Sequence, residues 1–205
     1  MNVTKRKGCG RILLHPFFAR DTVKVARDLI GREICREVKT RAGPVLLRAR
    51  IVETEAYLEK DDAAAHCSRG PTPRAKVMFG KAGVIYVYYI YGNYFMLNFV
   101  TEKTGLAGAV LIRAVEPLEG IPAMERNRKM KVGKNLTNGP AKLVLALGID
   151  GSLNGRTLGL PHLAVYEGKP VKQKDLVTTT RIGISVAQEL PLRFYEKGNP
   201  YVSKK

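Results

Sequence analysis

Three side chains that could do chemistry are spaced two residues apart: Glu53, Glu55 and Tyr57. Alternate side chains of a β-strand point to the same face, so these three share one face, to which the same period assigns Ile51. The opposite face carries Val52, Thr54 and Ala56. Two carboxylates are unusual on a face meant for a core, and carboxylates can act on a bound substrate or ligate a metal ion. The plainer alternative is a strand face exposed to solvent.

A second stretch, residues 84–99, is rich in aromatic rings. It contains five tyrosines: Tyr86, Tyr88, Tyr89, Tyr91 and Tyr94. Aromatic and β-branched residues on both sides of Gly92-Asn93 predict a β-hairpin with a tight turn. On its first arm, one face carries Tyr86, Tyr88 and Ile90. The other face carries Tyr89 and Tyr91. Such a hairpin could be plain core, or it could stack on flat rings and push a wedge between them.

The charge of the chain indicates what kind of flat ring this would be. Lys and Arg number 35 against 18 Asp and Glu, which gives a formal net charge of +17. A field of this size attracts polyanions and makes nucleic-acid binding sensitive to salt. A thermophile's charged surface is the plainer explanation, but its ion-pair networks need both signs. The composition therefore favours a nucleic-acid partner, with nucleobases as the rings.

Residues 58–82 form a long polar stretch, and long loops in compact domains are often functional. It carries Asp61, Asp62, His66 and Cys67. Together with the two glutamates, these acids and the histidine could form the metal site of a nuclease, although their spacing matches no tight ligand pattern. A thiol nucleophile at Cys67 is disfavoured, because side chains adjacent in sequence seldom meet as catalysis requires.

The remaining elements follow from capping residues and apolar spacing. Helices are predicted over residues 22–30, 122–130 and 140–147. Pro140 opens the last of these, and its first turn with Lys142 could hold a phosphate. A strand over residues 109–115 places Arg113 among apolar residues, where it could pair with a carboxylate.

No repeat or linker divides the chain. With 205 residues, of which 45 % are hydrophobic, we expect a basic, flexible arm over residues 1–12 and one domain over residues 13–205. The odd number of cysteines (Cys9, Cys35 and Cys67) and their spacing exclude a dense disulfide scaffold and favour a reducing compartment. Without a long apolar stretch we expect no membrane partner. The predicted location is intracellular, in the cytoplasm or nucleoid, or in the nucleus of a eukaryote.

A carboxylate, several aromatic rings, a histidine and an asparagine in a basic chain suit chemistry on an extruded base. A base inside a duplex is out of an enzyme's reach, so it must be rotated out and held by stacking while another side chain fills the gap. Two alternatives stay open. One is a non-catalytic nucleic-acid-binding protein, and the other is a metal-dependent nuclease that uses Asp61, Asp62 and His66.

Several short motifs keep the order and near-equal spacing of one known family from about Phe17 to Ser203. They are Val52–Tyr57, Ala64–His66, Thr72–Arg74, Met78–Phe79, Tyr86–Tyr88, Ile90–Gly92, Tyr94–Phe95, Leu111–Gly120, Gly139–Pro140, Lys142–Leu143 and Pro191–Tyr195. In these stretches the chain closely resembles the alkyladenine DNA glycosylases, the 3-methyladenine DNA glycosylase family typified by the human enzyme. The combination is specific to that family, although any one motif alone would be weak.

The resemblance implies a fold and a set of catalytic groups. The fold would be a single mixed α/β domain around a curved antiparallel β-sheet, with a protruding tyrosine-rich hairpin and flanking helices. Glu55 would be the general base that activates a water for attack on the anomeric carbon of the deoxyribose. Arg113 and the main-chain carbonyl of Ile182 would help to hold that water.

The resemblance also implies how the base and the DNA are held. The walls around the flipped base would be formed by Tyr57, His66 and Tyr88. Asn98 would screen purines by crowding the 2-amino group of guanine, and Tyr91 would be the wedge that enters from the minor groove. Arg74 and Lys142 would be contacts to the DNA backbone.

The implied substrates are 3-methyladenine, 7-methylguanine, hypoxanthine and ethenoadenine in double-stranded DNA, with an abasic site as the product. The resemblance implies no metal or organic cofactor and a monomeric protein. Cationic alkylated purines stack well on electron-rich rings and are already good leaving groups. Neutral lesions need protonation of the departing base, and the sequence does not identify the acid.

Overall fold

The computed structural model describes residues 9–41, 43–90, 92, 94–131, 133–160 and 162–204. Its strands are β1 (Glu33–Thr40), β2 (Gly43–Leu58), β3 (Ile85–Ile90), β4 (Tyr94–Val100), β5 (Gly108–Glu119), β6 (Ala164–Tyr166), β7 (Leu176–Thr179) and β8 (Arg193–Glu196). Its α-helices are α1 (His15–Phe18), α2 (Thr22–Asp28), α3 (Ile121–Arg128) and α4 (Pro140–Ala146). Short 3-10 helices cover His66–Arg69, Lys76–Phe79, Lys134–Leu136, Gly151–Leu153 and Gln173–Asp175.

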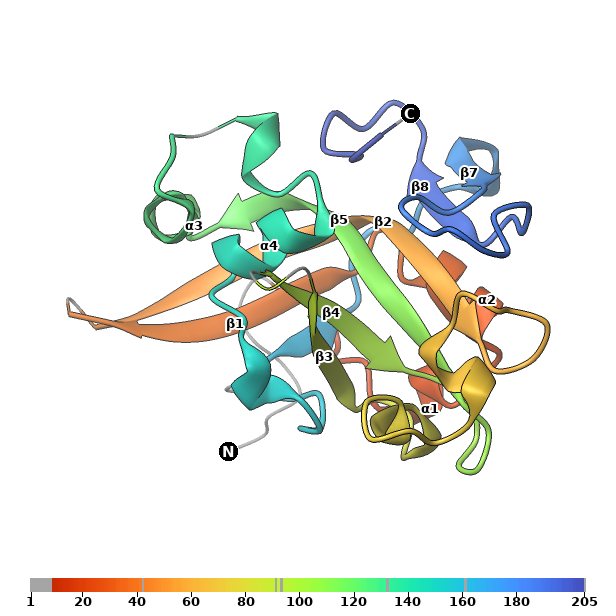
Figure 1. The fold of residues 1–205 in the computed structure, drawn as a ribbon. Helices are drawn as coiled ribbons and strands as arrows, with labels where there is room; N and C mark the ends of the chain where they lie inside the picture. The colour runs from red at the N-terminus through yellow and green to blue at the C-terminus, as the bar shows by residue number, and fades with distance from the viewer. Residues whose placement is uncertain are drawn as a thin grey trace.

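One antiparallel sheet of eight strands organises the described residues (Figure 1). Its order is β3-β4-β5-β2-β1-β6, and β8 pairs with both β2 and β7. Helix α2 packs against β2 and β5, while α4 packs against β4 and β5 and is itself covered by α3. The predicted mixed α/β domain around an antiparallel sheet with flanking helices is therefore confirmed.

Strand β2 is the longest strand, and it changes partner along one edge. It pairs with β1 as far as Arg50 and with β8 from Glu53 to Glu55, while β5 pairs along its other edge. Glu53 and Glu55 consequently lie inside the sheet, and both are fully buried. The alternative of a solvent-exposed strand face is wrong.

A β-bulge interrupts β2 just before the two glutamates. The register of β2 against β5 shifts between Ile51 and Glu53, which leaves Val52 as the extra residue. A bulge of this kind locally breaks the alternation of faces. Ile51 therefore packs into the main hydrophobic core with Ala56, whereas Val52 lies in a separate cluster with Val202. The prediction that Ile51 shares a face with the glutamates is wrong for this reason.

The tyrosine-rich hairpin is confirmed. Strands β3 and β4 pair in register from Ile85 and Phe99 to Ile90 and Tyr94, and Gly92 takes the positive φ of 68° expected in the turn. The side chains alternate as predicted, since Tyr86 is buried and the Tyr89 side chain next to the tip is exposed. Because β3 stands at one end of the strand order, this hairpin forms an edge of the sheet.

The predicted helices are present with shifted ends. Helix α2 begins at Thr22, where the Asp21 side chain accepts a hydrogen bond from the main-chain N–H of Lys24, but it ends at Asp28. Helices α3 and α4 lie within one or two residues of the predicted bounds. Within the described ranges, no helix has the length and apolar character needed to cross a membrane.

Residues 9–12 are packed against the domain, while residues 1–8 of the predicted arm lie outside the described residues. Ile12 is buried and forms a bridge with Tyr166, and the N–H of Leu13 donates to the Val165 carbonyl at 2.8 Å. The free thiols of Cys9 and Cys35 lie 3.6 Å apart. The packed part of the chain thus begins before residue 13.

Candidate active site

Glu55 lies on β2, and both oxygens of its buried carboxylate have partners. Oε1 accepts a hydrogen bond from the main-chain N–H of Ile182 at 2.8 Å, and Oε2 accepts one from the Tyr57 hydroxyl at 2.9 Å. Arg113 Nη1 lies 3.2 Å from Oε2. An ionised carboxylate oxygen can accept more than one hydrogen bond, so Oε1 has room for one further donor such as a water.

The surroundings of Glu55 push its pKa in opposite directions. Burial raises the pKa of the carboxyl, whereas the Arg113 guanidinium and the Ile182 N–H lower it; the net shift is upward. Burial and the nearby Glu55 charge also raise the pKa of Tyr57, so its hydroxyl remains a neutral donor. The result is a carboxylate that is more basic than an exposed glutamate and has a cation beside it.

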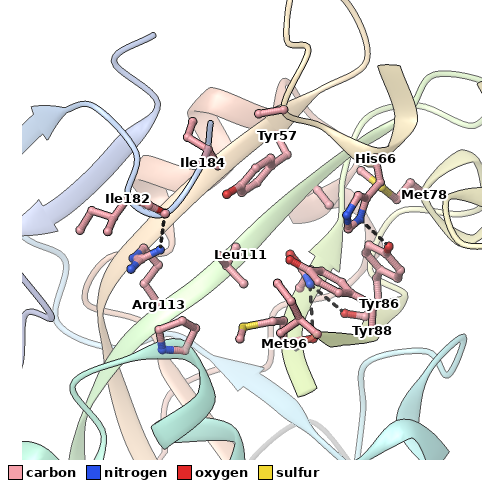
Figure 2. Close-up of a pocket in the computed structure, with 16 residues that line it drawn as sticks. Tyr57, His66, Met78, Tyr86, Tyr88, Met96, Leu111, Arg113, Ile182 and Ile184 are labelled. Atoms are coloured by element: carbon pink, nitrogen blue, oxygen red, sulfur yellow. Dashed lines mark hydrogen bonds between the residues drawn. The ribbon is translucent and has the colours of Figure 1, made fainter. Parts of the chain in front are cut away.

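Arg113 projects from β5 and pairs with a carboxylate, as its position in the sequence suggested. Its Nε lies 3.4 Å from Glu53 Oε1, and its Nη1 donates to the Ile182 carbonyl at 3.4 Å (Figure 2). The same guanidinium therefore touches both glutamates and the carbonyl beside them. This places one cation among all the groups that could hold a water next to Glu55.

A cavity of about 310 Å3 opens beside these groups (Figure 2). Its lining residues are Tyr57, Ala64, His66, Met78, Tyr86, Tyr88, Ile90, Met96, Asn98, Ala109, Leu111, Arg113, Pro140, Ile182, Gly183 and Ile184. Three of them, Tyr57, Arg113 and Ile182, are also the three partners of Glu55. Mostly apolar and aromatic walls with a few placed polar groups are typical of a site for a flat organic ligand.

The aromatic side of the cavity consists of His66, Tyr86 and Tyr88, here called the aromatic wall. The His66 ring meets the Tyr88 ring edge to face with centroids 4.7 Å apart, and the Tyr86 and Tyr88 centroids are 5.3 Å apart. His66 Nδ1 lies 2.9 Å from the Tyr86 hydroxyl oxygen (Figure 2). Burial, followed by the Arg74 charge, lowers the pKa of His66, so this wall is uncharged at neutral pH.

Arg74 braces this wall from outside the cavity. Its guanidinium lies over the Tyr88 ring, 4.9 Å from the centroid, and donates to the main-chain carbonyl of Tyr89. Arg74, which the sequence analysis expected to contact the DNA backbone, therefore contacts the hairpin in this structure.

Two further buried groups fix the shape of the cavity. The Asn98 amide nitrogen donates to the carbonyls of Tyr86 and Met96 at 3.2 and 3.4 Å. Arg181, directly before Ile182, forms a two-bond ion pair with Asp62 at 2.6 and 2.7 Å. Its guanidinium lies over the Tyr57 ring at 4.6 Å and also donates to the Ala56 carbonyl, which ties the loop of Ile182 to β2.

A comparison with known families agrees with this arrangement. The sequence model described as methylpurine-DNA glycosylase matches residues 16–200, which is nearly the whole chain. The chain belongs to the methylpurine-DNA glycosylase family. Membership makes it a DNA glycosylase with a role in DNA repair.

The similarity to curated relatives covers almost the full length of this chain and of each relative. The chain is 47 % identical over 195 residues to a protein of Carboxydothermus hydrogenoformans, spanning 95 % of this chain and all of the relative. It is 47 % identical to a Prosthecochloris aestuarii protein, spanning 95 % and 92 %, and 43 % identical to a Legionella pneumophila protein, spanning 95 % and 99 %. Each of these relatives is named “Putative 3-methyladenine DNA glycosylase”.

The structure of this methylpurine-DNA glycosylase family member brings most of the assigned residues together. Six of them line the cavity: Tyr57, His66, Tyr88, Asn98, Arg113 and Ile182. Glu55 lies behind three of the lining residues, namely its partners Tyr57, Arg113 and Ile182. Lys142 lies on α4, where its Nζ donates to the Asn138 side chain at 2.8 Å. The proposed wedge, Tyr91, lies outside the described residues.

The residues considered for a metal site are used in other ways. Asp62 is held by Arg181 and by the main-chain N–H groups of Leu58 and Ala64, and His66 is paired with Tyr86. No group of three potential metal ligands occurs among the residues that the structure describes. Burial raises the pKa of the Cys67 thiol to about 11, which makes it a poor nucleophile.

Sequence analysis missed several groups that build the site. Tyr86 could have been found, because it shares the strand face of Tyr88. Arg181 and Arg193 could not, since their roles depend on contacts between residues more than a hundred positions apart. Glu53 was singled out as a carboxylate, but its pairing with Arg193 could not be predicted from the sequence. Met78 and Met96 fill the cavity wall from separate elements, and no local spacing connects them.

Proposed function

We propose that this protein is a monofunctional DNA glycosylase that removes alkylated or deaminated purines by means of a water activated by Glu55. The observation that carries the proposal is the position of Glu55. It is a buried carboxylate of raised pKa, held by Tyr57, Arg113 and the Ile182 N–H at the boundary of an aromatic cavity. A protein that only binds nucleic acid has no need for such a group.

The cavity supports the binding of a flipped purine. Tyr88 and His66 offer flat faces and edges on one side, and Tyr57 lies on the other side in Figure 2. Stacking on each ring contributes about 1–3 kcal/mol, which is comparable to the few kcal/mol that unstacking a base costs. Damaged or mispaired bases unstack more easily, so the cavity favours lesions. Asn98 is held rigidly in the cavity, as a residue that screens purines by contact should be.

The chemical step follows from the groups around Glu55. A water held by the Ile182 carbonyl and the free acceptor position of Glu55 gives up a proton to the carboxylate as its oxygen bonds to the anomeric carbon. The bond from that carbon to the purine breaks, and its electron pair leaves with the base. The sugar keeps the new hydroxyl group, so the product is an abasic site in an unbroken strand. The Arg113 cation stabilises the carboxylate before the transfer and positions it for the attack.

The identity of the lesion decides how much help the leaving base needs. A 3-methyladenine or 7-methylguanine base is cationic in DNA and leaves as a neutral molecule. The uncharged His66 wall does not repel such a cation. Hypoxanthine and ethenoadenine, which we also propose as substrates, must gain a proton as they leave.

The approach to DNA rests on charge and on the hairpin. The net charge of +17 attracts the phosphate backbone, and Lys142 at the start of α4 is a candidate phosphate contact beside the cavity residue Pro140. We propose that Tyr91 fills the gap left by the flipped base and that one protein molecule acts on one lesion.

The experiment uses an end-labelled duplex with one hypoxanthine or ethenoadenine, or DNA containing 3-methyladenine, with EDTA present throughout. Strand breaks that appear only after hot alkali, and only with the native chain rather than Glu55→Gln, are the expected result. Breaks without alkali would indicate a nuclease or lyase. Full activity of Glu55→Gln would remove Glu55 from the mechanism, and binding without base release on every lesion would favour the non-catalytic protein.

A further inference from the structure

Glu53 is a second fully buried carboxylate that the mechanism above does not use. Its Oε1 accepts hydrogen bonds from Arg193 Nη1 at 2.8 Å and Ser203 Oγ at 3.0 Å, and lies 3.4 Å from Arg113 Nε. Its Oε2 accepts the main-chain N–H of Ser203 at 2.7 Å. A buried charge is tolerated only when it is paired and hydrogen-bonded. Glu53 meets that condition through Arg193 and Ser203, and it also forms an ion pair with Arg113, which touches Glu55.

The charged side chains around Glu53 alternate in sign. The order in space is Glu55, Arg113, Glu53 and Arg193, with each member within 3.4 Å of the next. Arg113 is thus shared between two carboxylates. A guanidinium with only one carboxylate in reach prefers to form two parallel hydrogen bonds with it. The attraction of Glu53 for Nε keeps Arg113 from turning fully onto Glu55 and occupying the positions where a water would bind.

Arg193 connects this pair to the loop that presents Ile182. Its Nε donates to the Thr180 carbonyl at 2.9 Å, and its Nη1 donates to the Lys204 carbonyl at 2.8 Å as well as to Glu53. One side chain of β8 therefore fixes the start of the loop, the second glutamate and the end of the described chain.

The C-terminal segment 199–204 lies against the bulge of β2. Val202 packs in a small cluster with Val52, and the Asn199 side chain donates to Glu196 at 2.9 Å. Figure 1 shows the C-terminus beside β8. The bulge turns Glu53 toward this segment, where the Ser203 N–H and hydroxyl complete its hydrogen bonds.

We propose that Glu53, Arg193 and the segment at Ser203–Lys204 form a positioning relay that holds the Arg113 guanidinium beside Glu55. The relay rests on the proposed function, because it acts through Glu55 as the base. None of its members touches the base or the water. Their part is to set the orientation of Arg113 and the electrostatic potential at Glu55.

The relay predicts opposite shifts for Glu53→Gln and Arg193→Gln in the acid limb of the pH–rate profile, which is the range where the rate falls as Glu55 becomes protonated. The charged and titratable groups on the elements packed against Glu55 are Glu53 and Tyr57 on β2, Arg113 on β5, Arg193 and Tyr195 on β8, and Arg181, paired with Asp62, on the loop. Glu53→Gln removes a negative charge, so the two arginines favour ionised Glu55 and the limb moves to lower pH. Arg193→Gln removes a positive charge and leaves Glu53 to compete for Arg113, so the limb moves to higher pH.

The test measures the single-turnover excision of hypoxanthine against pH, together with the dissociation constant for a duplex that carries a tetrahydrofuran abasic-site analogue. We expect the plateau rate of Glu53→Gln and Arg193→Gln to fall about 10- to 100-fold, with affinity for the analogue nearly unchanged. Arg193→Lys keeps the charge, so its limb stays in place while its plateau falls. Ser203→Pro, which removes the N–H donor, should slow excision more than Ser203→Ala. The matched control is Glu33→Gln, a half-buried carboxylate of β1 that pairs with Arg48 at 3.8 Å and does not line the cavity.

Three results would overturn the relay: native rates in the variants, limbs of Glu53→Gln and Arg193→Gln that shift in the same direction, or slower excision by these two variants with no shift of either limb. If Arg193→Gln does not fold, Arg193→Lys and the two Ser203 variants decide the matter. Glu55→Gln measured in parallel separates the two proposals. An active Glu55→Gln contradicts the proposed function, whereas an inactive Glu55→Gln beside native-like Glu53→Gln contradicts the relay alone.

Discussion

The charged wall, as we call the buried cluster of Glu53, Glu55, Arg113 and Arg193 behind the cavity, lies in the middle of the sheet, and of its members Arg113 lines the cavity. The aromatic wall lies on the edge hairpin and the loop beside it. Each member of the charged wall is at most 7 % exposed and has partners on more than one element. In the aromatic wall Tyr86 is buried but Tyr88 is only partly so, and the next tyrosine along the strand is exposed.

The difference follows from what each wall has to do. A buried charge without a partner costs several kcal/mol, so ionised groups that must stay dry need a surround that fixes them from all sides. The interior of a sheet, with strands on both edges of β2, provides it. Stacking needs only a flat face at the right separation, and it must admit a base from DNA. An edge hairpin offers this because one of its sides is open.

The largest predicted effect concerns the ion pair that joins the loop of Ile182 to the loop that follows β2. Arg181 and Asp62 are both buried, and Arg181→Met leaves the Asp62 carboxylate without its main partner. We expect the free energy of unfolding to fall by about 3–5 kcal/mol, measured by urea denaturation. Asp61→Asn, a change at the exposed neighbouring position, is the control and should stay within about 0.5 kcal/mol of the native chain. Equal stabilities would show that the fold does not need this connection.

The aromatic wall should respond in binding rather than in folding. Tyr88→Ala removes a stacking face, and we expect about 1–3 kcal/mol weaker binding of a duplex with ethenoadenine, measured by fluorescence titration with Glu55→Gln as the common background. Tyr88→Phe keeps the ring and should bind as the parent does. Equal losses for the two variants would assign the contribution to the hydroxyl instead of the ring.

The two walls differ in the direction of their pKa shifts, because the pKa of Glu55 is raised and that of His66 is lowered. The mechanism needs ionised Glu55, whose pKa lies above its ordinary value because of burial. The single-turnover rate should therefore fall as the pH drops through a midpoint higher than that of an exposed glutamate, by about tenfold per unit below it. The pKa of His66 is lowered by burial, so its ring is neutral at every pH above the ordinary pKa of histidine. Titration of His66 should therefore cause no loss of rate near neutral pH. A rate that is flat down to the range of an exposed glutamate would be incompatible with this assignment.

The smallest effect is predicted for the hydrogen bond inside the aromatic wall. Tyr86→Phe removes the hydroxyl that lies 2.9 Å from His66 Nδ1 and leaves the ring in place. A single neutral hydrogen bond contributes about 1 kcal/mol, so excision of hypoxanthine at limiting enzyme should slow by about fivefold. Tyr94→Phe, a half-exposed hydroxyl on the same hairpin, is the control. A much larger fall in the excision rate of Tyr86→Phe would mean that His66 acts in the reaction and does not only form part of the aromatic wall.

The same contrast explains how much could be read from the sequence. The aromatic wall was largely predictable, because a run of tyrosines around Gly92 fixes a hairpin and period two sorts Tyr86 and Tyr88 onto one face. The motif around Glu55 was recognisable through its resemblance to a family. The bulge at Val52 was not, since it depends on how β5 pairs with β2, and it reversed the prediction for Ile51.

The long-range half of the charged wall was also beyond sequence reasoning. Arg193 and Ser203 reach Glu53 across 140 and 150 positions, and Arg181 reaches Asp62 across 119. Each of these residues looks like an ordinary surface residue of a basic chain when it is seen alone. Only burial and pairing give them a role.

The measurement that tests the central claim most directly compares Glu55→Gln and Tyr88→Ala on one ethenoadenine duplex, with the single-turnover rate at saturating enzyme and the dissociation constant determined for each. A division of labour between the walls predicts that Glu55→Gln loses about a thousandfold or more in rate with binding nearly unchanged, because it removes the base that acts only in the chemical step. Tyr88→Ala should lose mainly affinity. A Glu55→Gln variant that keeps its rate, or two variants that lose rate and affinity in the same proportion, would contradict the claim.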